Sequence, residues 1–122
     1  RKDQTITPLQ ALTLMNNVTF VESARHLAER VMTQEDLTSE DERITYAFKA
    51  ILSRPPSSRE LALLKEDFLH HEEIFSKNPQ AVGQLLKVGE KPNDPKLPSA
   101  ALAAYAMVAS TILNLDEAIS LN

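Results

Sequence analysis

The 122-residue chain contains no cysteine. This absence excludes disulfide bonds, thiolate zinc sites, cysteine nucleophiles and covalent attachment of a c-type haem within this sequence. The chain also has no tryptophan, only two glycines and 5% aromatic residues. Because β-proteins use glycine in many of their turns, the shortage of glycine favours helices over sheets.

An excess of basic residues is also missing. Thirteen Lys and Arg stand against seventeen Asp and Glu, giving a net charge of −4. Nucleic-acid binding needs clustered positive charge to neutralise phosphates, so we expect no nucleic-acid partner.

Residues 1–7 are polar and hold no signal peptide, and the chain opens without Met. We therefore expect a fragment of a longer protein.

Helix-capping residues divide the sequence into segments. Thr7-Pro8 and Gln10 predict the start of a short helix, and Asn17 the start of a second that runs to about Thr33. The other boundaries come from the same kinds of signal. They are the capping boxes Ser39/Glu42 and Ser57/Glu60, the Arg54-Pro55-Pro56 stop, the Asn78-Pro79 start with Gly89 as its end, and a start near Pro98 running to about Leu115.

Apolar residues recur at helical spacing within these segments, as in Phe20, Ala24, Leu27, Ala28 and Val31. No segment alternates as a strand would. The connections are short, which favours antiparallel neighbours. The sequence therefore predicts a single all-α domain over residues 1–122. We expect a compact bundle of five to six helices around an Ala-rich central C-terminal helix.

The last helix admits two interpretations. The 19 residues from Leu97 to Leu115 carry no charge. A run of this length is long enough for a membrane-spanning helix. A helix apolar all round is buried either in lipid or at the centre of a protein. The run contains six alanines together with Ser99, Ser110, Thr111 and Asn114. Small residues let neighbouring helices approach closely, so we favour the central helix and do not expect a membrane partner.

The segment His70-His71-Glu72-Glu73 is the most suggestive chemical cluster. Glu66 and His70 are four residues apart, and His70 and Glu73 three, so each pair shares a helix face. Glu66, His70 and Glu73 are accordingly candidate metal ligands. A zinc site needs three or four ligands, and no H-E-x-x-H pattern occurs. The simpler interpretation is a solvated face on the side away from Leu61, Leu64 and Phe68.

No catalytic arrangement is recognisable, since no serine lies in a G-x-S-x-G elbow and no phosphate-binding glycine loop occurs. Met15, Met32 or Met107 together with a histidine is an alternative site for a non-covalent haem. Methionine at helical spacing is usually core filler, so we expect no cofactor.

A second polar group interrupts the apolar segments at Asn16, Asn17, Asn114 and Asp116. Buried amides must find hydrogen-bond partners. We therefore predict a structural polar joint, in which these four residues hold the connection between the first two helices against the end of the last helix.

Two long motifs carry a resemblance to a known family. They are Thr7-Pro8-Leu9-Gln10-Ala11-Leu12-Thr13-Leu14-Met15-Asn16, followed by Thr19-Phe20-Val21-Glu22, and the terminal Leu113-Asn114-Leu115-Asp116-Glu117. Between them come the Arg54-Pro55 turn with Ser57 and Glu60, and the segment from Asn78-Pro79 to Gly89. The sequence resembles the C-terminal region of domain of unknown function 1553, the planctomycete cytochrome c-associated family.

The resemblance implies a C-terminal piece of a larger exported protein of the periplasm or cell envelope, often encoded with cytochrome c-like haem domains. It implies no reaction and supplies no catalytic residues. The first hypothesis is a non-catalytic structural and interaction domain that packs against the rest of its parent chain or another protein. The alternative is a part of an enzyme or cytochrome-linked redox protein whose site upstream segments complete.

Overall fold

The computed structural model describes the backbone of residues 18–86 and 97–121, and the side chains of residues 22–86 and 97–115. Five helices make up this part of the chain, and no strand occurs in it. They are α2 (Val18–Thr33), α3 (Glu40–Leu52), α4 (Ser58–Ser76), α5 (Pro79–Leu86) and α6 (Ser99–Leu121). The helix predicted after Thr7 and the predicted end at Gly89 lie outside the described residues.

The predicted capping boxes start α3 and α4. Ser39 Oγ accepts a hydrogen bond from Glu42 N at 3.1 Å, and Glu42 Oε1 accepts one from Ser39 N at 3.2 Å. Ser57 and Glu60 repeat this reciprocal pattern at 3.1 and 2.8 Å. These bonds satisfy backbone N–H groups that the first helical turn leaves without an intrahelical partner.

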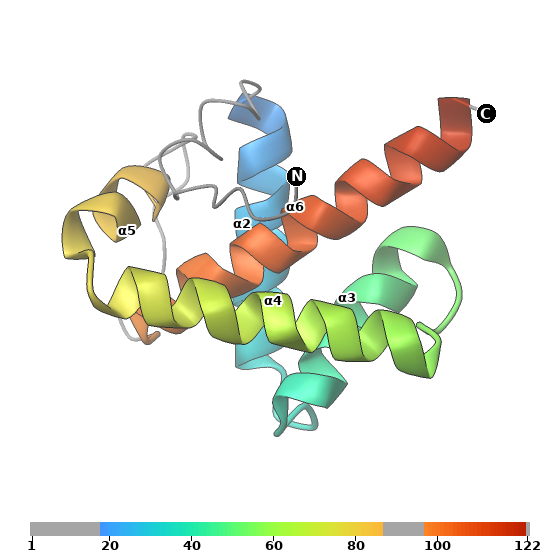
Figure 1. The fold of residues 1–122 in the computed structure, drawn as a ribbon, viewed down its shortest axis with the longest axis horizontal. Coiled ribbons are helices and arrows are strands. Elements are labelled where there is room, and N and C mark those ends of the chain that lie inside the picture. Colours follow the sequence, from blue (N-terminus) through green and yellow to red (C-terminus); the bar gives the residue numbers. More distant parts are fainter. Residues whose placement is uncertain (1–17, 87–96, 122) are drawn as a thin grey trace.

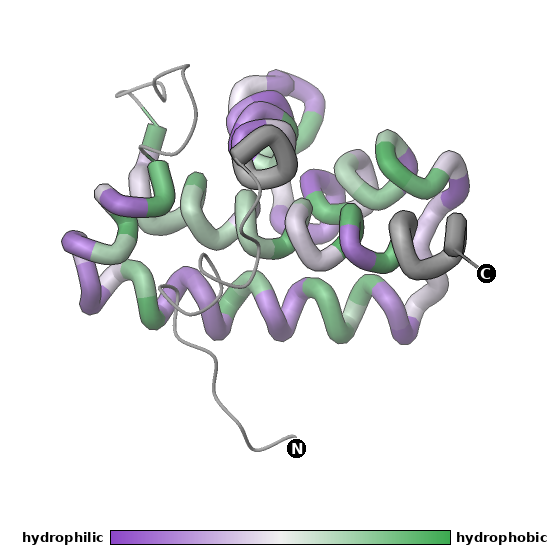
Figure 2. The backbone as a smooth tube through the Cα atoms, turned by 90° about the horizontal axis from the view of Figure 1, so that it is seen from above, coloured by the Kyte–Doolittle hydropathy of each residue, from purple (hydrophilic) through white to green (hydrophobic). Residues whose placement is uncertain are grey.

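The helix α6 lies at the centre of the bundle, as predicted. It contacts each of the other four helices. The two views show it between α4 on one side and α2 on the other (Figures 1 and 2). Residues 102–110 are all buried, which is the burial expected of a helix surrounded on every side by protein. The all-α bundle around an Ala-rich C-terminal helix is therefore confirmed.

The two sides of α6 differ in side-chain size. Tyr105 faces α4, where its ring stacks on Phe68 with the ring centroids 4.2 Å apart. The opposite side of the helix carries Ala103, Ala106 and Ser110, all buried. The helix α2 contributes Ala24 and Ala28 to the core. Small residues on both helices allow their backbones to approach closely.

The helix α6 continues to Leu121 rather than ending near Leu115, so the predicted end was wrong by about two turns. The acidic residues Asp116 and Glu117 follow the predicted end. No glycine or proline follows them before Leu121, and these are the residues that commonly stop a helix. Thr111, Asn114 and Leu115 are exposed, so water solvates polar side chains at this end without breaking the helix.

None of the helices in the described part of the chain has both the length and the apolarity that a membrane crossing requires.

Enlarging a small residue at the centre should test this packing. Ala103 is fully buried, so Ala103→Leu is expected to lower the free energy of unfolding by about 1–3 kcal/mol through overpacking. Urea unfolding followed by circular dichroism measures the change. Ala62→Leu, at an exposed position of α4, is the matched control and should change stability little. Equal stability of the two variants would contradict the central placement of α6.

Candidate functional site

The three candidate metal ligands lie on the outside of α4. Glu66, His70 and Glu73 are all exposed. Glu73 Oε2 is 3.3 Å from Lys77 Nζ, in an ion pair one helical turn apart. Within the described residues, no three histidine or acidic side chains gather as a metal site requires. Glu66, His70 and Glu73 therefore do not come together as one ligand group in the described structure.

His71 corrects the interpretation of this segment as a solvated face. Only 9% of the residue is exposed, and its ring stacks on Phe75 with centroids 6.2 Å apart. The reason is its position in the core stripe of α4, which reads Leu64, Phe68, His71 and Phe75. This spacing of four, three and four residues was visible in the sequence, but counting only apolar residues missed it.

The His71 ring is held by an acidic residue one turn earlier. His71 Nε2 lies 3.2 Å from Asp67 Oδ1, so its N–H can donate to the carboxylate. That bond leaves the lone pair on Nδ1. His71 Nδ1 and Asp67 Oδ2 are both buried and have no hydrogen-bond partner in the described part of the chain. A nitrogen without solvent access cannot reach a substrate. In this conformation the Asp67–His71 pair is therefore part of the packing at the edge of the core.

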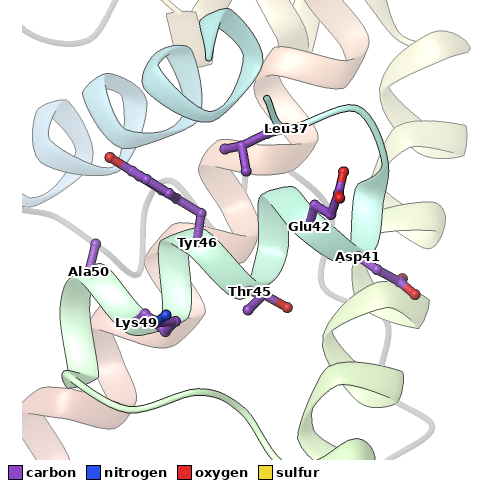
Figure 3. Close-up of a pocket in the computed structure, with 7 residues that line it drawn as sticks. All are labelled: Leu37, Asp41, Glu42, Thr45, Tyr46, Lys49 and Ala50. Atoms are coloured by element: carbon purple, nitrogen blue, oxygen red, sulfur yellow. The ribbon is translucent and has the colours of Figure 1, made fainter. Parts of the chain in front are cut away.

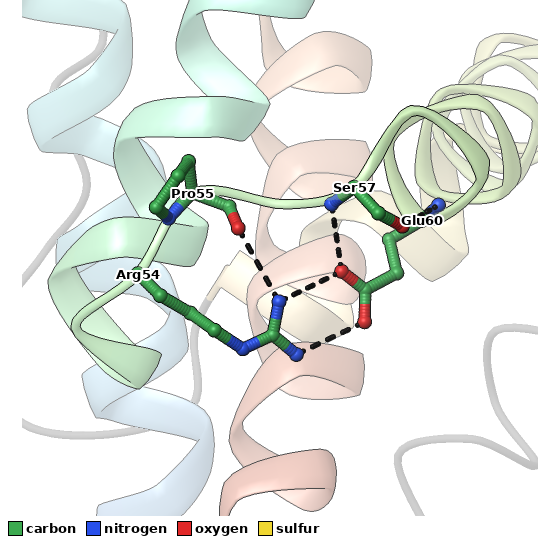
Figure 4. Close-up of polar contacts among 4 residues, drawn as sticks. All are labelled: Arg54, Pro55, Ser57 and Glu60. Atoms are coloured by element: carbon green, nitrogen blue, oxygen red, sulfur yellow. Dashed lines mark hydrogen bonds and ion pairs between the residues drawn. The ribbon is translucent and has the colours of Figure 1, made fainter.

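A polar contact between Arg54 and Glu60 spans the turn between α3 and α4 (Figure 4). Arg54 donates to both oxygens of Glu60, from Nη1 to Oε1 at 2.9 Å and from Nη2 to Oε2 at 3.0 Å. The Arg54 guanidinium also lies 4.9 Å from the centroid of the buried Phe48 ring, within cation–π range. Ser53, which ends α3, has a φ of 62°, and this left-handed residue turns the chain toward α4.

These contacts keep Glu60 ionised. Chiefly the Arg54 hydrogen bonds, with the Ser57 N–H, lower the pKa of Glu60 to about 2. At the other capping box, hydrogen bonds from Thr38 and Ser39 lower the pKa of Glu42. A carboxylate that stays charged and accepts several hydrogen bonds is a poor proton donor or acceptor near neutral pH. Both acids serve as helix caps.

A further polar contact joins three helices. Cζ of Arg43, from α3, lies 5.9 Å from the centroid of the Tyr105 ring of α6, which stacks on Phe68 of α4. Burial raises the pKa of Tyr105, and the Arg43 guanidinium opposes that shift. No sequence pattern indicated this contact, because its residues are far apart in the chain.

The predicted polar joint lies mostly outside the described residues. Neither the positions Asn16 and Asn17 nor the side chain of Asp116 is described. Asn114 is exposed, so burial does not oblige its amide to find a partner within the protein. The joint itself stays a prediction.

A groove of about 590 Å³ lies over α3 (Figure 3). The described residues that line it come from α3 and the loop before it. They are Leu37, Asp41, Glu42, Thr45, Tyr46, Lys49 and Ala50. Asp41 Oδ1 pairs with Lys65 Nζ of α4 at 3.2 Å, and Tyr46 Oη accepts a long hydrogen bond from Gln34 Nε2 at 3.5 Å. None of the described residues that line the groove is a histidine.

The Asp67–His71 pair makes a testable unit. Asp67→Ala leaves the imidazole N–H without its acceptor and is expected to lower the free energy of unfolding by about 1 kcal/mol. In a His71→Phe background the same change should cost almost nothing, because no N–H remains. Urea unfolding of all four chains completes a double-mutant cycle. Glu66→Ala, at an exposed neighbouring position, is the control in both backgrounds. Additive single changes would mean that the two side chains do not interact.

The Arg54–Glu60 contact should shape the acid stability of the domain. The pKa of Glu60 is about 2 in the folded chain against an ordinary value of 4.5. The contribution of ionised Glu60 to the stability of the fold is therefore complete above about pH 4.5, and it disappears as the pH falls toward 2. Glu60→Gln should lower the melting temperature at pH 7 and flatten its decline between pH 5 and pH 2 by comparison with the wild type. Glu73→Gln, in an exposed ion pair, should leave the profile unchanged. A Glu60→Gln profile parallel to that of the wild type would contradict this assignment.

The chain was compared with known families, proteins and structures. The family described as "PSD1: Protein of unknown function (DUF1553)" matches residues 1–68. No curated protein and no solved structure matches the chain. The matched region includes α2, α3, the Arg54–Glu60 turn and the first half of α4. Since the match covers more than half of the sequence, the chain belongs to the PSD1 (DUF1553) family of proteins of unknown function.

Proposed function

We propose that the chain is a non-catalytic helical domain that gives structure and an interaction surface to an exported multidomain bacterial protein. One observation carries the proposal. Shifted pKa values of acidic residues often indicate an active site, but in the described part of the chain the acids whose pKa values are lowered, Glu42 and Glu60, cap helices. The carboxylates of these two residues accept hydrogen bonds that hold the N-termini of α3 and α4 in place.

The interaction surface would lie on the outer side of α4. Leu63 is 54% exposed and Leu69 46% exposed, although the same helix buries Leu64 and Phe68. These leucines offer apolar area to a partner, with Glu66 and His70 between and beside them. The family resemblance supplies the rest of the proposal: export, a longer parent chain as the partner, and association with cytochrome c-like domains.

One observation favours the second candidate, a redox protein or enzyme whose site is completed by another part of the parent chain. The exposed His70 lies next to the buried His71, which is paired with the half-buried Asp67, and the two imidazole centroids are 5.8 Å apart. An exposed imidazole beside a carboxylate-held one could take part in a shared site at a domain junction.

Charge placed on the leucine surface separates the two candidates. In the parent protein, Leu63→Asp with Leu69→Asp should lower the melting temperature of the whole protein or release this domain to limited proteolysis. In the isolated chain the same variant should melt close to the wild type, because both positions are exposed.

His70→Ala is the matched variant for the second candidate. Under the first proposal it leaves the parent protein's stability and absorbance spectrum unchanged. A parent protein that tolerates both aspartates, and whose haem or metal spectrum changes with His70→Ala, would contradict the first proposal in favour of the second.

A further inference from the structure

The outward face of α3 has an ordered pattern of charge. Glu42, Thr45, Tyr46 and Lys49 follow one another at intervals of three, one and three residues, so they share one face. Ile44, Ala47 and Phe48 are buried on the opposite face. The groove over α3 lies along this outward stripe, with Leu37 and Ala50 adding apolar area (Figure 3).

The stripe carries an acid at one end, a base at the other and neutral side chains between. Glu42 makes its three side-chain hydrogen bonds, from Thr38 and Ser39, through Oε1. Its other oxygen, Oε2, takes part in none of these bonds. Lys49 is exposed and has no ion-pair partner within the described part of the chain. Both charges are therefore available to a partner.

We propose that this face binds the same face of a second copy of the chain, with the two α3 helices antiparallel. A two-fold axis between positions 45 and 46 would set Glu42 of each copy opposite Lys49 of the other. Thr45 would then lie opposite Tyr46 at the centre. A two-fold interface must be self-complementary, and this order of charges meets that condition. A parallel arrangement would instead oppose like charges.

The size of the face sets the expected strength. A stable interface usually engages some 20–30 residues on each side, whereas seven described residues line this groove. We therefore expect a weak dimer, which salt weakens further because its ion pairs lie at the surface. This inference does not depend on the proposed function, which uses α4 rather than α3.

Sedimentation equilibrium over a range of concentrations up to about 1 mM, which detects dissociation constants up to that order, tests the dimer. The wild-type chain should dimerise reversibly. Lys49→Glu should weaken the dimer at least tenfold, because it sets a second carboxylate opposite Glu42 of the other copy. Adding Glu42→Gln to that variant should restore part of the association, because glutamine removes the repulsion and still caps the helix. Melting curves check that each variant stays folded.

Cross-linking tests the geometry separately. Because the chain has no cysteine, Thr45→Cys places one thiol near the proposed axis. A short bismaleimide should then link two copies of this variant. Ala62→Cys, at an exposed position of α4, should give little cross-linked dimer. A wild-type chain that stays monomeric at 1 mM, a dimer that Lys49→Glu leaves intact, or equal cross-linking at positions 45 and 62 would overturn the proposal.

Discussion

The close packing of small residues around α6 is the constraint on which the other helices depend. The side of α6 away from Tyr105 carries Ala103, Ala106 and Ser110, while α2 contributes Ala24 and Ala28 to the core. On the other side, larger rings fill the space between α6 and α4. Since α3 and α5 also contact α6, a change in side-chain size on this helix would alter the position of every other described helix.

Charged residues hold the helix ends around this core. Glu42 and Glu60 close the N-termini of α3 and α4, and Arg54 spans the turn between those helices while covering Phe48. The family match takes in this turn and both capping boxes. These acids fix the path of the chain, so the proposed function gives them no catalytic role. The proposed role of the domain depends on its exposed surfaces instead.

Short-range patterns predicted most of the fold, and long-range packing explains what they missed. Ser39/Glu42 and Ser57/Glu60 were predictable because a capping box is complete within four residues. His71 was misplaced because a polar residue can occupy a core position when a neighbour such as Asp67 provides its hydrogen bond. The contact between Arg43 and Tyr105 arises only when the helices pack together, so no local pattern indicates it.

Native-state hydrogen exchange of the isolated chain tests the central role of α6 most directly. If α6 organises the bundle, the amides of residues 102–112 should exchange only through global unfolding and show the highest protection in the chain. The amides of α3 and α5 should exchange at lower free energies through partial opening. This role would be contradicted if α6 exchanged at lower free energy than α2 and α4, because those helices would then form a stable core without it.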